Sequence, residues 1–143
     1  MRDLSISFYI INLALLATHQ VDAAFWHEWE LFGLAGGAPT FLLLNFVVMT
    51  IFLHGFRQLL ARIPSGHRYA GVMASIGILV FVIHVFHMAH GGFAFTPPSS
   101  VALLVMIVMV SVAQLVVAVK ESREQRRTQN GRPVDANSDS GLA

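Results

Sequence analysis

The chain has 143 residues, which is the length of one ordinary domain, but its composition excludes a soluble globule. Hydrophobic residues make up 55% and charged residues 12%, whereas about a quarter of the residues in soluble domains are charged. The absence of cysteine excludes disulfides, thiolate zinc sites, iron–sulfur clusters and covalently attached haem. The net charge of +1 conceals an uneven distribution of charge along the chain.

Four long apolar stretches predict an all-α protein, a four-helix transmembrane bundle. Each stretch is close to the roughly 20 residues that cross a hydrocarbon core of about 30 Å. None shows the alternation of a membrane β-barrel strand. The predicted spans are residues 4–24, 40–60, 69–90 and 101–119.

The distribution of Lys and Arg predicts the orientation of these spans. All nine basic residues precede the first span, lie around the turn between the second and third spans, or follow the fourth. The positive-inside rule therefore predicts cytoplasmic N- and C-termini. The connections 25–39 and 91–100 then face outward, without Lys or Arg, and contain residues typical of an interfacial aromatic belt: Trp26, Trp29, Phe32, Phe93 and Phe95.

The segment 120–143 is predicted to be a cytoplasmic tail, first basic and then disordered. Its basic part is expected to continue the last helix into the headgroup layer, where Lys and Arg bind anionic lipids. We interpret this charge as a topology anchor, with the lipid bilayer as partner, and expect no nucleic-acid partner.

The first span has a second interpretation as a cleaved secretory signal peptide. Arg2, the apolar core and the small-residue pattern around Ala23 are typical of one. Against this, Asp3 adjoins Arg2, and cleavage would leave three helices whose two ends lie on opposite sides of the membrane.

Polar residues gather at the outer ends of the first and third spans. His19 and Asp22 lie three residues apart in the first span, and His84, His87 and His90 follow at three-residue steps in the third. Residues three apart share a helix face, and both spans run outward. We therefore expect both groups to lie in one layer, which Asn45 of the second span can join.

This outer layer predicts a metal site. Five of the seven histidines fall in it, and imidazole with carboxylate but without thiolate suits zinc, iron, manganese or copper. The best-placed ligands are His19, Asp22, His84 and His87, with His27 and His90 as further candidates. Asp22 is also the candidate general base. The HExxH pattern and the Glu-x-x-His pair of di-iron bundles are absent.

Other interpretations of the same layer stay open. Haem b held between His19 and His84 is one, and a structural or pH-responsive polar network is another. Glu28 and Glu30, among tryptophans, are interpreted as solvated charges of an interfacial helix. His54 and His67 are assigned to the opposite side of the membrane.

Several patterns predict contacts between helices. Gly71-x-x-x-Ser75 and Ala70-x-x-x-Ala74 predict a small-residue face on the third span, which favours close helix packing and permits a helix-mediated oligomer. Ser111 and Gln114 are predicted to form interhelical hydrogen bonds.

The stretch Thr18-His19-Gln20-Val21-Asp22-Ala23, followed by His27-Glu28-Trp29, resembles an uncharacterised family of small bacterial four-span membrane proteins with a T-H-x-x-D-A and H-E-W pattern. The resemblance covers the first two spans. It implies four helices in a bacterial inner membrane and no particular activity. The ceramidase and progestin-receptor-like membrane hydrolases, which hold zinc between helices, are similar in kind, but they have seven spans and another motif order.

Three classes of function follow. The first is a membrane-embedded hydrolase or oxidoreductase whose metal site acts on a lipid-like substrate. The second is a metal or haem carrier subunit, and the third is a non-enzymatic structural or pH-responsive membrane protein. A channel or pump is less favoured, because the inner half of the spans lacks acidic residues.

Overall fold

The computed structural model describes residues 2–90 and 97–130. This part of the chain contains helices and no strand. The elements are α1 (Arg2–Phe25), α2 (Glu28–Leu31), α3 (Gly37–Leu60), α4 (Ser65–Ala89) and α5 (Pro98–Asn130). The predicted all-α fold is confirmed, since four of these helices are long and apolar enough to cross a membrane.

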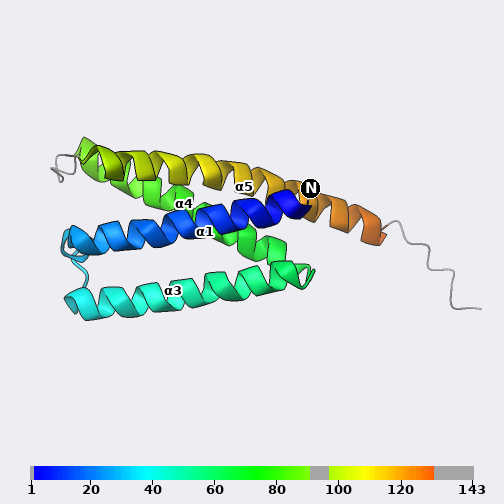
Figure 1. Cartoon of the computed structure of the whole chain (residues 1–143), viewed down its shortest axis with the longest axis horizontal. Coiled ribbons are helices and arrows are strands. Elements are labelled where there is room, and N and C mark those ends of the chain that lie inside the picture. The colour runs from blue at the N-terminus through cyan, green and yellow to red at the C-terminus, as the bar shows by residue number, and fades with distance from the viewer. Residues whose placement is uncertain (1, 91–96, 131–143) are drawn as a thin grey trace, which may run out of the picture.

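The four long helices run alternately up and down (Figure 1). Helix α5 packs mainly on α4 and α1, while α3 packs mainly on α4. The start of α1 and the end of α5 lie at the same end of the bundle, and α2 lies at the other. We call the latter the α2 end. The expectations for Phe93, Phe95 and the tail beyond residue 130 fall outside the described residues.

The helices extend past the apolar stretches of the sequence. Helix α3 begins at Gly37, so Pro39 lies in its first turn, and α5 begins at Pro98. Proline is tolerated there because its missing N–H would have no partner inside the helix. Helix α5 continues through the basic segment to Asn130, as expected for residues 120–130.

The core lies among the helices, and a buried long-range hydrogen bond crosses it. The Tyr9 hydroxyl donates to the carbonyl oxygen of Phe52 at 2.7 Å, which joins α1 to α3. The buried apolar core consists of Tyr9, Leu16, Phe52, Leu59, Ala70, Met73, Leu103, Ile107 and Ala118.

Small residues bring α4 close to α5, although only part of the predicted face is used. Ala70 and Ala74 are fully buried, as the prediction requires. Gly71, in contrast, has open space where a Cβ would stand, and Ser75 is exposed. The closest approach is at Gly77, where a Cβ would collide with the Ser111 side chain.

Three buried polar side chains join α1, α4 and α5 in the middle of the bundle. Asn12 donates through Nδ2 to Gln114 Oε1 at 2.6 Å, and Ser111 Oγ donates to Asn12 Oδ1 at 3.2 Å. Gln114 Nε2 donates to the carbonyl oxygen of Ala70 at 3.1 Å. The predicted interhelical bonds of Ser111 and Gln114 are confirmed. We call this set the middle network.

The outer surface of the bundle is apolar. Helix α3 is the clearest example, with Leu42, Leu43 and Phe46 all more than 60% exposed. Soluble monomers rarely expose contiguous apolar surface on this scale, whereas a lipid bilayer covers it. This surface indicates a membrane environment.

Candidate metal centre

Three buried side chains from three helices meet at the α2 end. They are His19 of α1, Glu28 of α2 and His84 of α4, with exposed fractions of 3%, 2% and 4%. Each offers a ligand atom, and these atoms all lie within 4.8 Å of one another. We call this set the three-residue group.

A left-handed residue positions Glu28. Helix α1 ends at Phe25, and His27 adopts φ 53° and ψ 41° directly before α2. Histidine is among the non-glycine residues that tolerate this conformation, which turns the chain sharply. Glu28 and Glu30 then project about 200° apart on the helix. Glu28 is buried and Glu30 is exposed, so the interpretation of both as solvated charges is wrong for Glu28.

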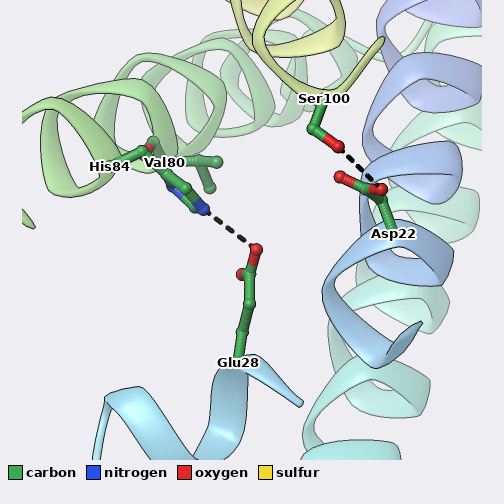
Figure 2. Close-up of polar contacts among 5 residues, drawn as sticks. All are labelled: Asp22, Glu28, Val80, His84 and Ser100. Atoms are coloured by element: carbon green, nitrogen blue, oxygen red, sulfur yellow. Dashed lines mark hydrogen bonds and ion pairs between the residues drawn. The ribbon is translucent and has the colours of Figure 1, made fainter. Parts of the chain in front are cut away.

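The hydrogen bonds of His84 fix the orientation of its ring. Its Nδ1 lies 2.8 Å from the carbonyl oxygen of Val80, and its Nε2 lies 3.2 Å from Glu28 Oε1 (Figure 2). A carbonyl oxygen only accepts, so Nδ1 carries the hydrogen. If the ring is neutral, Nε2 carries no hydrogen and is an acceptor, like the Glu28 oxygen that it faces. Two acceptors repel each other, so this contact is favourable only with a proton or a cation between the two atoms.

His19 lies against His84 on the neighbouring helix. The ring centroids are 5.0 Å apart, and the rings meet edge to face. The Nδ1 atom of His19 is buried and has no hydrogen-bond partner in the part of the chain that the structure describes. Buried polar atoms nearly always have partners, so we expect this nitrogen to contact a ligand or an ordered water molecule.

The donor set fits a divalent transition metal. Two histidines and one carboxylate bind catalytic zinc and non-haem iron(II) with positions left open. Ligand atoms around a tetrahedral zinc lie roughly 3.3 Å apart, given bonds of about 2.1 Å. The spacing of His84 and Glu28 is close to this value, and the ligand atom of His19 lies within 4.8 Å of both.

Asp22 lies close to the three-residue group but is not a member of it. It is one turn beyond His19 on α1, and its Oδ1 accepts a hydrogen bond from Ser100 Oγ at 3.0 Å (Figure 2). Its other carboxylate oxygen, Oδ2, is buried and lacks a hydrogen-bond partner among the described residues. This free oxygen can accept a proton.

The other predicted ligands contact aromatic rings instead. His87 packs edge to face on Phe32, with ring centroids 5.5 Å apart. His90 is exposed, lies on Phe86 and contacts the carbonyl oxygen of Phe86 through Nδ1. His27 is exposed and packs on Trp29. The structure therefore brings together only His19 and His84 of the six predicted ligands, and it adds Glu28.

A cavity of about 300 Å³ adjoins the three-residue group. Side chains of α1, α2, α3 and α4 line it, including all three members of the group. Asn45 of α3 also lines it, as expected for the outer layer, while its Nδ2 donates to the carbonyl oxygen of Phe41. The site thus combines buried ligands with an adjoining space for a small molecule.

The opposite end of the bundle holds a separate pair of ionisable groups. His67 of α4 lies 3.0 Å from Glu121 of α5, and His54 contacts Gln58 one turn away. Neither histidine lines the cavity or joins the three-residue group.

A family model matches residues 5–121, so the chain belongs to the family of unknown function DUF6713. The match spans α3 and α4 entirely and most of α1 and α5, and it includes every member of the three-residue group. No curated protein and no solved structure matches the chain.

Proposed function

We propose that this DUF6713 protein is a membrane metalloprotein in which His19, Glu28 and His84 bind one divalent transition-metal ion, zinc in the first instance, and that the centre is hydrolytic. One observation carries the proposal: the buried atoms His84 Nε2 and Glu28 Oε1 lie 3.2 Å apart, a contact that needs a proton or a cation between them. The unpartnered Nδ1 of His19 supports it.

The second contact of His84 supports the same assignment. Metal-binding histidines commonly donate their other ring N–H to a backbone carbonyl, which fixes the tautomer and the ring orientation. Val80 supplies that carbonyl. The burial of Glu28 also needs an explanation, because an uncompensated carboxylate in a low-dielectric interior costs several kcal/mol.

A zinc ion held by His19, Glu28 and His84 would lower the pKa of a water molecule to near neutrality and so supply the nucleophile that hydrolyses an ester or amide. Asp22, whose Oδ2 has no hydrogen-bond partner among the described residues, would accept the proton of this water and pass it to the leaving oxygen or nitrogen. Ser100 holds the other oxygen of Asp22 and orients the carboxylate.

Oxidoreductase chemistry is the second candidate, because two histidines and one carboxylate also form the ligand set of non-haem iron(II) oxygenases. Haem is less well supported. The rings of His19 and His84 are in edge contact, which leaves no space for a porphyrin between them. Haem binding predicts a Soret band after reconstitution, and the hydrolytic centre predicts bound metal without colour.

Elemental analysis tests the proposal directly. Protein purified without a polyhistidine tag is stripped with a chelator, reconstituted separately with zinc, iron(II), manganese and copper(II), and analysed for bound metal. We expect close to one zinc ion per chain. Less than a tenth of an ion with every metal would refute the metal site and leave the structural or pH-responsive network.

Glu28→Gln and Glu30→Gln form a matched pair for the ligand assignment. Both remove one carboxylate from the same short helix, but only Glu28 is buried in the three-residue group. We expect Glu28→Gln to lose most of the zinc and Glu30→Gln to retain it. Size-exclusion chromatography in detergent checks that both variants are folded.

The proposal includes the topology predicted from the sequence. With Lys and Arg on the cytoplasmic side, both termini are cytoplasmic and the three-residue group lies near the outer face of a bacterial inner membrane. A reporter fused after residue 143 should report a cytoplasmic C-terminus. A periplasmic signal would place the site on the inner face instead.

A further inference from the structure

We propose that the cavity beside the three-residue group binds the single acyl chain of an uncharged ester or amide, which enters from the bilayer and places its carbonyl group at His19, Glu28 and His84. The carbonyl assignment rests on the hydrolytic function proposed above. Binding of the chain follows from the shape and lining of the cavity, and it is tested separately.

The cavity is long and narrow. On α4 its lining runs from His84 through Val80 to Ile76, which spans about 12 Å at 1.5 Å per residue. On α3 it runs over nearly the same distance from Phe41 to Val48. A cavity of about 300 Å³ that extends over this length suits one extended alkyl chain.

The polarity of the lining changes along this length. His19, Glu28 and His84 lie at the α2 end, whereas the deeper walls are aliphatic. Val48 and Ile76 pack against the buried core and close the deep end. An occupant therefore has a polar head, an apolar tail and a limited tail length.

The cavity also reaches the apolar surface of the bundle. Leu44 and Phe32 line it, and their exposed fractions are 53% and 46%. Their neighbours on α3, Leu42 and Leu43, belong to the exposed apolar surface. A chain from the surrounding lipid can enter beside Leu44 without crossing water.

The charge of the lining selects the head group. Among the described residues that line the cavity, none is Lys or Arg, and Glu28 contributes a carboxylate. In the metal-free protein, a phosphate or a free carboxylate would therefore meet a negative group without a cationic side chain to offset it. An uncharged carbonyl avoids this cost, and the side-chain amides of Gln20 and Asn45 lie in the same lining.

The test measures binding of N-methyl dodecanamide with a terminal trifluoromethyl label by fluorine NMR. The protein is the full chain, metal-free, in phosphatidylcholine nanodiscs, because a detergent would itself occupy the cavity. We expect saturable binding of the dodecanamide. The octanamide should bind with lower affinity, because it fills less of the cavity, and the hexadecanamide should bind no more tightly than the dodecanamide, because the deep end is closed. Dodecyl phosphate should bind at least about tenfold more weakly than the dodecanamide.

Val48→Trp and Val47→Trp provide the matched pair. Val48 lines the deep end of the cavity, whereas Val47 is an exposed neighbour outside the lining. We expect Val48→Trp to weaken binding about tenfold or more, because several methylene groups lose their site, and Val47→Trp to leave it unchanged. Ile76→Phe repeats the test at the facing wall if Val48→Trp does not fold.

Each contrary result has a distinct meaning. Absence of saturable binding, or an equal loss in both valine variants, would overturn this inference, and so would equal affinity for dodecyl phosphate. If zinc binds but the amide does not, the inference fails and the proposed metal site stands. If the amide binds in the cavity but no metal binds, the proposed function fails and the protein is an acyl-chain binder.

Discussion

The middle network and the three-residue group both bury polar side chains between α1, α4 and a third helix, which is α5 for the network and α2 for the group, yet they differ in how these side chains are satisfied. Asn12, Ser111 and Gln114 are neutral and linked in one chain of donors and acceptors that ends on a backbone carbonyl. His19, Glu28 and His84 are ionisable; the contact of His84 with Glu28 needs a proton or a cation, and His19 Nδ1 has no hydrogen-bond partner among the described residues.

This difference separates a structural polar cluster from a functional one. A satisfied neutral network needs nothing further, and inside a membrane it positions helices at modest energetic gain. Buried ionisable groups with unmet hydrogen-bonding capacity are costly, and a bound cation removes that cost. The comparison therefore predicts that changes in one region affect metal binding and changes in the other affect stability.

The largest effect is expected for His84→Ala. Loss of a direct ligand should weaken zinc binding by more than about a hundredfold, since loss of an outer-shell partner alone costs 10- to 100-fold. Competition with a chromophoric chelator measures the affinity, and thermal unfolding of the metal-free protein shows whether the variant folds. Zinc affinity within tenfold of the original in a folded variant would contradict the proposed ligand set.

Gly77→Ala should give the largest loss of stability. The added Cβ collides with Ser111 and forces α4 away from α5, which should cost about 1–3 kcal/mol. Gly71→Ala is the control, because its Cβ meets open space and alanine favours the helix. Unfolding in mixed detergent measures the free energy of unfolding of both variants. Equal values would show that the close contact between Gly77 and Ser111 does not contribute to stability.

Asn12→Leu should have a smaller effect on stability and none on metal binding. It removes two interhelical hydrogen bonds, which in membrane bundles are worth about 0.6 kcal/mol each on average. We therefore expect a loss of about 1 kcal/mol with zinc affinity unchanged. A marked loss of zinc in a folded variant would mean that the two regions are coupled.

The smallest effect on metal binding is expected for His87→Ala. The structure places this ring against Phe32 rather than in the three-residue group, so zinc affinity should stay within about threefold. The ligand set predicted from the sequence, which includes His87, predicts loss of the metal instead. Chelator competition on this variant alone decides between the two sets.

Much of the fold could be predicted from the sequence because the bilayer imposes a simple rule. A long apolar stretch must form a helix to satisfy its backbone, so four stretches predict four spanning helices. The interhelical bonds of Ser111 and Gln114 were predictable for the same reason, since a polar side chain at membrane depth needs a partner. The ends of the helices were less predictable, because Pro98 starts α5 before its apolar stretch begins.

The candidate site was only partly predictable. His19 and His84 follow from their depth and from the shared direction of their helices. Glu28 does not, because Glu28 and Glu30 lie on opposite faces of a single helical turn and composition does not distinguish them. Its one sequence signal is its position within His27-Glu28-Trp29, the second part of the pattern from which the sequence predicted a family of small membrane proteins.

By itself, the sequence of this protein determined the number of helices, their alternating directions and the layer in which the histidines gather, since these depend on hydrophobic length and residue spacing alone. The tertiary structure decided which side chains in that layer meet. The left-handed conformation of His27 turns Glu28 inward, and the packing of α3 on α4 leaves the cavity beside it. Both depend on rotations of whole helices, which change a contact by several ångströms without changing any local pattern in the sequence.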